Sequence, residues 1–301
     1  MAVVEYAVDG RIARITLNRP ERGNGLTREL LRELGECVER ADLDPAVHVM
    51  LISGNGSGFC GGYDLVDSAE GEGGQTLAPE HEKGSPLDPM VVGANHDPSQ
   101  TWDAMTDYAM MRRNVRTFMS LFEADKPVIC KVHGFCVAGG TDMALCSDLV
   151  VAASDAKIGY PPARVWGSPT TSLWAHRIGA ARAKRLLLTG DSITGAEAAE
   201  WGLACEAPEP GELDERTEWL AERVARMPIN QLMMMKLLTN QTIEAQGLRA
   251  TQVLGTVFDG ITRHTKEGYD FQTTALTKGF REAVRERDEP FGDHGLEAFR
   301  G

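Results

Sequence analysis

Two glycine-rich segments, each placed directly after an apolar run, constrain this chain more than any other feature of its sequence. The first is GNGSGFCGGYDL at 54–65, which holds five glycines in its first nine residues. The second is CVAGGTDMALCSDL at 136–149. Glycine loses more conformational freedom on folding than any other residue, so a cluster this dense indicates backbone that something else must approach closely.

Both segments end in the same pattern, Gly-Gly-x-Asp-apolar, as GGYDL at 61–65 and GGTDM at 139–143. Each follows a predicted strand, 47–53 or 127–135, and each can continue as a helix. A glycine turn that opens a helix leaves backbone N–H groups unpaired, and the helix dipole favours negative charge there. One such turn can hold a phosphate. Two converging turns can each donate one N–H to a single oxygen, which is the arrangement of an oxyanion hole for a thioester enolate.

A rival interpretation is a dinucleotide site, because Gly56, Gly58 and Gly61 satisfy the G-x-G-x-x-G pattern after a strand. A Rossmann unit also needs a helix and then a second strand that ends in Asp or Glu about 20 residues on. Here that interval is the segment from residue 67 onward, which has no strand pattern, and no P-loop lysine follows the glycines. The sequence therefore favours the oxyanion interpretation.

The rest of the chain predicts a mixed α/β core followed by a helical part. Alternating apolar residues flank Asp9-Gly10 and predict a hairpin, and Thr27 is a candidate N-cap for the helix that follows. Further helices are predicted over 102–122, 175–189, 193–203, 213–227, 230–246 and 273–287, and a strand over 148–152. Because no compositional break precedes PEPG at 208–211, we expect a core over 1–207 and a helical region over 208–301.

The segment 67–100 differs from its surroundings, because it is rich in Gly, Pro and acidic residues and has no periodicity. We expect a long surface loop there, either a passive or disordered insertion or a lid.

Composition argues against several classes of function. The net charge of −13 argues against a nucleic-acid partner, although a local basic patch can still hold an anionic small molecule. No apolar run approaches the ~20 residues of a membrane span and the first residues lack a signal-peptide pattern, so we expect a cytoplasmic protein without a membrane partner. The six cysteines and seven histidines show no ligand spacing, so the sequence predicts no metal site.

Four motifs, in order along the chain, resemble the enoyl-CoA hydratase/isomerase, or crotonase, superfamily. They are LNRPERGNGL at 17–26, GSGFCGGYDL at 56–65, KVHGFCVAGGTDMALCSDLVVAA at 131–153 and LLTGDSITGAEAAEWGL at 187–203. The resemblance runs from about residue 3 to FREAVRERDEP at 280–290. It implies an α/β fold, a spiral of β-β-α units with a helical C-terminal trimerisation region, in a homotrimer or homohexamer. It also implies an acyl-CoA thioester substrate between the two glycine segments, and no cofactor beyond that coenzyme A.

The resemblance also implies roles for individual residues. The oxyanion donors are the backbone N–H groups of Tyr63 and Gly139, and Asp142 takes the position of one catalytic glutamate. The ring of Tyr63, where the family often has Ala, is a candidate wall of the acyl pocket. Arg22 is a candidate for the CoA phosphates or pantetheine, with a solvated surface arginine as the alternative. Backbone groups on the adenine side and further substrate contacts are implied at Cys60, Gly62, Asp64, Leu65, Gly140 and Pro162.

For Asp64 and Asp142 the sequence also leaves open a purely structural role. Asp64 can simply complement the N-terminus of a helix, because a negative charge is favourable there. Asp142 can likewise be a helix-start residue, a role that aspartate often fills.

Pro162 marks the departure from the family pattern. Hydratases of the family carry a second glutamate in the segment F-G-x-P-E, whereas residues 158–162 are IGYPP here. Proline cannot transfer a proton, and it offers no backbone donor. The following segment, 163–174, is also shorter than the family's glycine-rich turn, which indicates a remodelled pocket wall.

Three interpretations of the active centre follow. In the first, Asp142 alone, or with a water molecule or Tyr160, hydrates or isomerises an enoyl-CoA. In the second, the site catalyses another thioester reaction, such as hydrolysis or C–C cleavage. In the third, the protein binds acyl-CoA without turnover. The hypothesis we take forward is a hydratase-like enzyme that converts a 2-enoyl-CoA and water to a 3-hydroxyacyl-CoA, with Asp142 as the acid/base.

Overall fold

The computed structural model describes residues 2–64 and 83–292, and its larger sheet has five strands in the order β1-β2-β3-β4-β6 over those residues. These strands are β1 (Val4–Asp9), β2 (Ile12–Leu17), β3 (Val49–Gly54), β4 (Val128–Val132) and β6 (Leu149–Ala152). β1 and β2 pair antiparallel across Asp9-Gly10, which confirms the predicted hairpin, and the remaining neighbours pair parallel. The buried strand predicted before the first glycine segment is β3.

A second sheet pairs β5 (Phe135–Val137), β7 (Lys157–Gly159) and β8 (Ser192–Thr194). The single strand expected over 127–135 is therefore two strands in different sheets, and the chain turns between them at Gly134, whose φ is 57°. A Cβ at Gly134 would lie 1.9 Å from the carbonyl oxygen of Ser57, so only glycine allows this turn beside the first glycine segment. The turn carries the chain from the large sheet into the second glycine segment.

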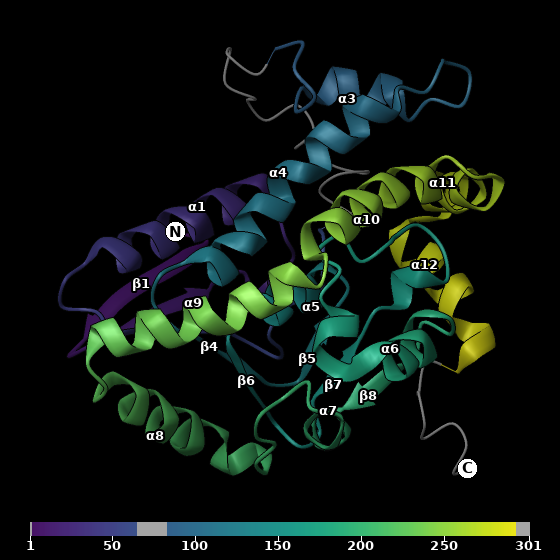
Figure 1. The fold of residues 1–301 in the computed structure, drawn as a ribbon. Helices are drawn as coiled ribbons and strands as arrows, with labels where there is room; N and C mark the ends of the chain where they lie inside the picture. Colours follow the sequence, from purple (N-terminus) through teal and green to yellow (C-terminus); the bar gives the residue numbers. More distant parts are fainter. Residues whose placement is uncertain (1, 65–82, 293–301) are drawn as a thin grey trace.

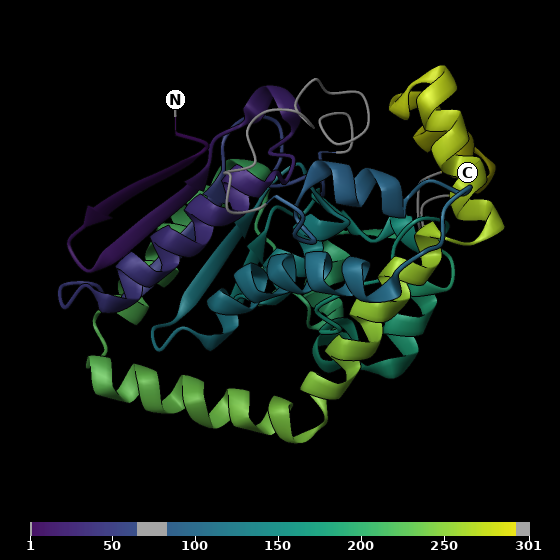
Figure 2. The same cartoon turned by 90° about the horizontal axis from the view of Figure 1, so that it is seen from above.

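Helices cover both faces of the large sheet (Figure 1, Figure 2). On one face, α1 (Arg28–Leu43) and α4 (Ala104–Glu123) run side by side, and on the other face α8 (Leu213–Ala225) contacts β2, β3, β4 and β6. Thr27 caps α1 as predicted, because its side chain accepts a hydrogen bond from the backbone N–H of Leu30. The largest buried apolar cluster lies between these layers and includes Ile15, Ile52 and Phe118.

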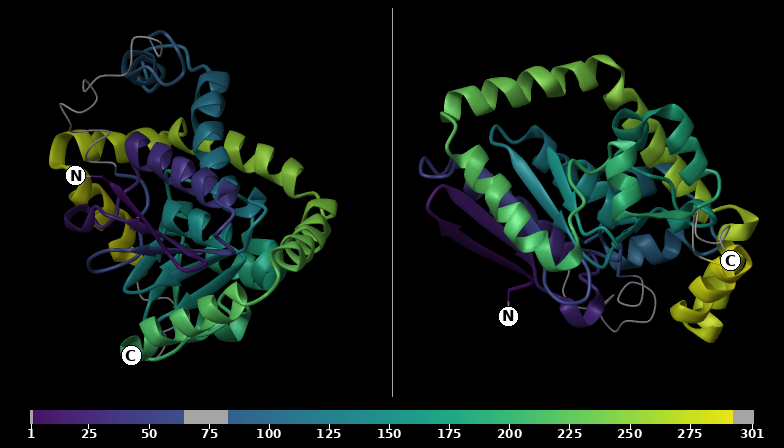
Figure 3. Two further views of the ribbon diagram at one scale, coloured as in Figure 1. Left: turned by 90° about the vertical axis from the view of Figure 1, so that its left-hand side faces the viewer. Right: turned by 90° about the horizontal axis from the view of Figure 1, so that it is seen from below.

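From Gly139 onward the chain is mostly helical. Besides α8, the helices of this part are α5 (Gly139–Leu145), α6 (Trp174–Leu187), α7 (Gly195–Trp201), α9 (Ile229–Ala245), α10 (Leu248–Arg263), α11 (Lys266–Lys278) and α12 (Phe280–Asp288). Short 3₁₀ turns lie at η1 (Pro20–Arg22), η4 (Pro161–Ala163), η5 (Pro210–Glu212) and η6 (Glu289–Phe291). The helix expected over 193–203 is shorter, since β8 occupies its start, and the one expected over 273–287 is divided at Gly279. Figure 3 shows that α9 forms an outer edge of the molecule.

The segment 67–100 departs from the expected loop, because α3 (Pro89–Asn95) forms within it and contacts α4. Asp88 caps this helix by accepting a hydrogen bond from Met90, and Pro89 stands at its first turn, so its start is chemically well specified. Residues 65–82 lie outside the described part of the chain, so the choice between a passive insertion and a lid stays a prediction.

The proposed boundary at residue 207 stays a prediction. Leu213, Ala221 and Leu248, which follow it, belong to the same buried cluster as the strands. In the part of the chain that the structure describes, no helix has the length and apolar character to cross a membrane.

Candidate active site

The two glycine segments lie directly against each other. Cys60 and Cys136 pair as an isolated parallel bridge between them. The N–H of Val137 donates to the carbonyl oxygen of Cys60 over 3.1 Å, and the N–H of Cys60 donates to the carbonyl of Phe135 over 3.2 Å. Segments that are about 75 residues apart in the chain therefore share a short backbone ladder.

Close approach explains much of the glycine content. A Cβ at Gly62 would lie 2.7 Å from the Cβ of Ala138 and 3.3 Å from the backbone nitrogen of Gly139. A Cβ at Gly140 would lie 2.5 Å from the carbonyl oxygen of Cys60. The distances of 2.7 and 2.5 Å are shorter than real Cβ contacts, so each segment needs glycine because the other segment is there.

The predicted oxyanion donors lie at this junction. Tyr63 forms a parallel bridge with Leu26, in which Leu26 donates to the carbonyl of Gly62 over 2.8 Å and Asp64 donates to the carbonyl of Leu26 over 3.1 Å. The N–H of Tyr63 itself points away from Leu26, and among the described residues no hydrogen bond uses it. Gly139 is the first residue of α5, so its N–H has no acceptor within the helix. Both N–H groups are therefore available to a bound oxygen.

Asp142 lies in the first turn of α5 and is 1% exposed. Its Oδ1 accepts two hydrogen bonds from Thr171, one from the backbone N–H over 3.1 Å and one from the hydroxyl over 2.6 Å. The residue before the helix is Ala138, and no side chain caps α5. Asp142 therefore does not cap its own helix, and its carboxylate is held by a segment 29 residues further along the chain.

The pKa of Asp142 suits proton transfer. Burial raises it from the ordinary value of 3.8 to about 7, although the hydrogen bonds from Thr171 act in the opposite direction. The negative charge of Asp259 raises it further. A carboxyl group with a pKa near 7 exists in both forms at neutral pH, which is what a general acid/base requires.

Two tyrosines border this carboxylate. The ring of Tyr63 lies over α5, since a Cβ at Gly139 would be 3.2 Å from its Cε2, and it is tilted against Phe118 at a centroid distance of 6.5 Å. The hydroxyl of Tyr160 donates to the carbonyl of Ser168 over 2.8 Å. Burial and the charge of Asp142 raise the pKa of both phenols well above 10, so both stay neutral. The hydroxyl proton of Tyr160, which we considered as a second proton-transfer group beside Asp142, is thus used in the hydrogen bond to Ser168.

Pro162 is a packing residue of the loop in which it lies. It is part of η4, and a Cβ at Gly167 would lie 2.6 Å from the Cβ of Pro162. Within the same loop, Trp166 and Ser172 have φ values of 78° and 57°, which are costly for residues other than glycine. The loop is therefore tightly folded, and Pro162 supplies no proton-transfer group.

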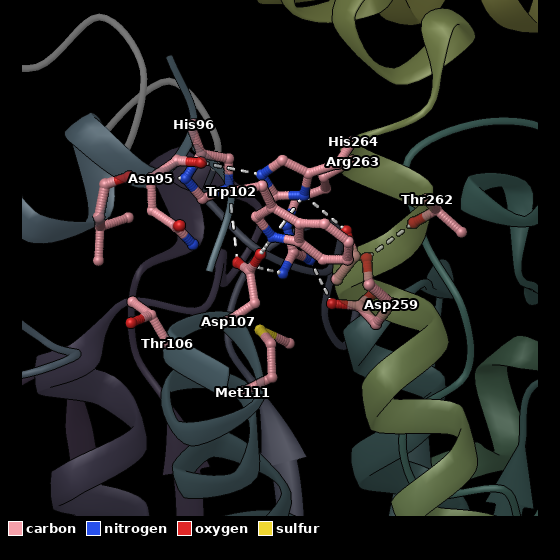
Figure 4. Close-up of polar contacts among 12 residues, drawn as sticks. Asn95, His96, Trp102, Thr106, Asp107, Met111, Asp259, Thr262, Arg263 and His264 are labelled. Carbon is pink, nitrogen blue, oxygen red and sulfur yellow. Dashed lines mark hydrogen bonds and ion pairs between the residues drawn. The ribbon is translucent and has the colours of Figure 1, made fainter. Parts of the chain in front are cut away.

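Sequence analysis missed a second buried carboxylate, Asp259 of α10, whose negative charge acts on Asp142. Figure 4 shows Asp259 with its partner Arg263. Its Oδ1 accepts the N–H of Ser168 over 3.2 Å, and its Oδ2 pairs with Nη1 of Arg263. Nη2 of Arg263 in turn pairs with Asp107 over 3.0 Å. Asp259 and Arg263 are four residues apart, which by pattern alone indicates an ordinary exposed helical ion pair. Only the fold shows that the pair is buried.

Arg22 lies beside the first glycine segment, where it pairs with Asp64. Its Nη2 is 2.7 Å from Oδ1 and its Nε is 3.1 Å from Oδ2, while Nη2 of Arg19 is 2.9 Å from the same Oδ2. The side chain of Asp64 is buried, whereas that of Arg22 is 35% exposed. Leu65, the next implied contact, lies outside the described residues.

The backbone of Cys60 joins the two glycine segments. Its thiol is buried, donates to the carbonyl of Asn24 over 3.2 Å, and has a pKa that burial raises to about 12. All six cysteines are free thiols. Within residues 2–64 and 83–292, no cluster of His, Cys, Asp and Glu is arranged to hold a metal ion.

Comparison with known proteins finds relatives along most of the chain. The family model described as enoyl-CoA hydratase/isomerase matches residues 8–85 and 96–277. A putative enoyl-CoA hydratase of Mycobacterium tuberculosis is 32% identical over 247 residues, which cover 80% of this chain and 74% of that protein. The 1,2-epoxyphenylacetyl-CoA isomerase of Escherichia coli is 30% identical over 73% of this chain and 75% of its own.

Solved structures resemble this one closely. A crystal structure of an enoyl-CoA hydratase from Mycobacterium smegmatis superposes with a TM-score of 0.91 at 57% identity, over 97% of this chain and 95% of that one. An enoyl-CoA hydratase/isomerase from Xanthobacter autotrophicus gives a TM-score of 0.81 at 25% identity. The expected crotonase fold is confirmed. The chain belongs to the enoyl-CoA hydratase/isomerase family, and it is an acyl-CoA-processing enzyme of the crotonase superfamily.

Proposed function

We propose that this enzyme adds water to a 2-enoyl-CoA and forms a 3-hydroxyacyl-CoA. The observation that carries the proposal is the position of Asp142, a buried carboxyl group with a pKa of about 7 in the first turn of α5. Gly139 opens that same helix, and Gly62 and the ring of Tyr63 lie against it. The proposed acid/base and one proposed oxyanion donor therefore belong to α5, and the residue of the other donor packs on that helix.

Hydration of the double bond gives each of these groups a role in the proposed reaction. The N–H groups of Tyr63 and Gly139 donate to the thioester oxygen, which becomes negative as an enolate forms. The ionised carboxylate of Asp142 takes a proton from water while the water oxygen bonds to C3. The protonated Asp142 then delivers a proton to C2 as the enolate collapses. Asp142 thereby serves as both base and acid, and no group is required at Pro162.

The coenzyme A portion is proposed to lie along the first glycine segment. Backbone groups of Cys60, Gly62, Asp64 and Leu65 contact it there, and Gly140 lets the chain approach from the other side. Arg22 is the proposed phosphate contact, because it keeps a third of its side chain exposed beside a buried carboxylate. The proposal includes no metal and no cofactor other than the coenzyme A of the substrate.

We also propose that the protein self-associates, as a homotrimer or homohexamer. In α10 the usual amphipathic pattern is inverted, because polar and small residues such as Gln252, Thr256 and Asp259 are buried. The apolar side chains of α9 and α10 are exposed instead: Met234, Met235, Leu237, Leu238, Val253, Leu254, Phe258 and Ile261. So many exposed apolar side chains on two consecutive helices are typical of an interface between protein chains.

Double-bond isomerisation is the second candidate reaction. Pro162 leaves the expected second position without a proton-transfer group, and moving a double bond needs only one group that removes a proton from one carbon and returns it to another. Asp142 alone meets that requirement.

Incubation with crotonyl-CoA and longer 2-enoyl-CoAs tests hydration directly. Loss of the absorbance of the conjugated thioester, with a product heavier by one water, supports it. A product of unchanged mass from a 3-enoyl-CoA supports isomerisation instead. Asp142→Asn should abolish the observed rate, whereas Asp148→Asn, which alters a partly buried carboxylate bonded to a backbone N–H, should not. Tight acyl-CoA binding in calorimetry without turnover at any chain length contradicts both reactions and indicates a binding protein.

A further inference from the structure

The segment 168–172 is held between Asp142 and helix α10. On the α5 side, Thr171 donates twice to Asp142. On the α10 side, the N–H of Ser168 donates to Asp259 over 3.2 Å, and the hydroxyl of Ser172 donates to the carbonyl of Thr251 over 2.9 Å. The position of Thr171, and with it the carboxylate of Asp142, therefore depends on α10.

Close packing keeps this segment near the helix. A Cβ at Gly255 would lie 2.8 Å from the carbonyl oxygen of Pro169 and 2.9 Å from the hydroxyl of Ser172, so α10 can meet the segment only where it carries glycine. Ser172 has a φ of 57°, a conformation that persists only where the surroundings hold it.

Asp259 is itself fixed by a chain of buried charges (Figure 4). Arg263 joins Asp259 to Asp107 of α4, and the indole N–H of Trp102 donates to Asp107 over 2.5 Å. Burying one charge of such a chain without its partners is costly, so the carboxylate of Asp259 has little freedom to turn. A rigid carboxylate is what a residue needs in order to fix the N–H of Ser168.

We propose that Asp259 is a positioning residue for Asp142, which it controls through the 168–172 segment that it anchors at Ser168. The proposal rests on the acid/base role given to Asp142 above. Asp259 has no contact with Asp142 among the hydrogen bonds of the described residues, so it acts through Thr171 and through its own negative charge.

The charge of Asp259 acts together with the other titratable groups around Asp142. These groups are Tyr63, Tyr160, Cys136 of β5 and Cys146 at the end of α5, and burial keeps each of them neutral by raising its pKa. Asp259 in turn faces Arg263 on its own helix and Asp107 on α4, and beyond Asp107 lie His96 and His264. Asp259 is thus the neighbouring anion that raises the pKa of Asp142.

Titration of the Asp142 carboxyl tests the proposal without any need for turnover. Infrared difference spectra of the full-length protein, with ¹³C-labelled aspartate, follow the protonated carboxyl, and Asp142→Asn assigns its band. Asp259→Asn removes the negative charge of residue 259 but keeps an amide oxygen that can accept the N–H of Ser168. The titration midpoint of Asp142 should therefore fall by about one pH unit. Asp259→Ala also releases Ser168, which weakens the hydrogen bonds from Thr171, so its midpoint should lie above that of Asp259→Asn. The control, Asp148→Asn, should leave the midpoint unchanged.

A double-mutant cycle separates positioning from general loss of structure. Thr171→Val removes the hydroxyl donor to Asp142 and keeps the backbone N–H donor. If Asp259 acts through Thr171, the difference in titration midpoint between Asp259→Ala and Asp259→Asn should therefore shrink in a Thr171→Val background. Where enoyl-CoA turnover is measurable, Asp259→Ala should lower kcat about tenfold or more with KM within about twofold, and the acid limb of the pH profile should follow the titrated midpoint.

Two results overturn the proposal. One is an Asp142 midpoint that is the same in the wild type, Asp259→Asn and Asp259→Ala. The other is an effect of Asp259→Ala that is fully retained beside Thr171→Val. A wild-type protein that turns over no enoyl-CoA contradicts the proposed reaction instead, and the infrared titration still decides the role of Asp259.

Discussion

The hydroxyl of Thr171 donates to Oδ1 of Asp142 over 2.6 Å, and the backbone N–H of Thr171 reaches the same oxygen over 3.1 Å. Both hydrogen bonds favour the ionised carboxylate, whereas burial favours the protonated one. The pKa of about 7 reflects burial and the charge of Asp259, which raise it, against these hydrogen bonds, which lower it, so Thr171 tunes the proposed acid/base.

Thr171→Val should shift the acid limb of the pH–rate profile upward. The substitution removes the hydroxyl that stabilises the ionised form, and a hydrogen bond to a charged group contributes about 1.5–3 kcal/mol, or roughly one to two pH units. The profile of kcat/KM measures the shift, and Thr171→Ser, which keeps the hydroxyl, is the control. An unchanged profile in Thr171→Val is the contrary result.

Asp142→Asn should flatten the pH dependence of stability. The folded-state pKa of Asp142, about 7, lies above its ordinary value of 3.8, so its contribution to stability is complete below about pH 4 and is lost as the pH rises through 7. Asparagine does not titrate. The variant should therefore gain roughly 2–4 kcal/mol relative to the wild type between pH 4 and pH 8, as measured by urea unfolding. A constant difference between the two proteins across this range would contradict a raised pKa.

Gly139→Ala should reduce kcat strongly. The new Cβ would meet Cδ1 of Leu26 at 2.7 Å and Cε2 of Tyr63 at 3.2 Å, so the junction that holds both proposed oxyanion donors must shift. Loss of one such donor lowers kcat by about 10²–10³-fold. Gly93→Ala in α3, where a Cβ has nothing within 4 Å, is the matched control and should leave turnover unchanged. Full activity of Gly139→Ala would remove this residue from the site.

Arg22→Ala should weaken binding of the coenzyme A portion and leave the chemical step alone. We expect KM for an enoyl-CoA to rise about tenfold with kcat nearly constant, because one charged contact to a phosphate is lost. The test compares the enoyl-CoA with the same acyl group on N-acetylcysteamine, which has no phosphates and should be processed equally by both proteins. If Arg22→Ala reduces kcat/KM equally for both substrates, Arg22 instead has a structural role through its ion pair with Asp64.

Charged substitutions on α9 should prevent self-association. Leu238 is 65% exposed, and Leu238→Glu places a carboxylate in the proposed apolar interface. Light scattering after gel filtration should then report a smaller species than the wild type. Leu43→Glu, at a position on α1 that is 73% exposed, should not change the mass. A wild type that is itself monomeric would contradict the assembly.

Local sequence pattern predicted much of the fold. Thr27 caps α1, Asp9-Gly10 closes the hairpin, and the apolar run before the first glycine segment forms β3. These features depend on interactions between near neighbours in the chain, which a sequence displays directly. Local pattern did not predict the turn at Gly134. Glycine is required there because the carbonyl of Ser57 lies close by, and this contact joins distant segments of the chain.

Local motifs are enough to indicate the family and to identify Asp142, Tyr63 and Gly139 as candidate site residues. What surrounds these residues is visible only in the folded protein. Folding brought Thr171 to Asp142 and buried Asp259 with Arg263 behind the 168–172 segment. The physical reason is that burial and long-range hydrogen bonds set the pKa of a carboxyl group, and both arise only when separate parts of the chain pack together.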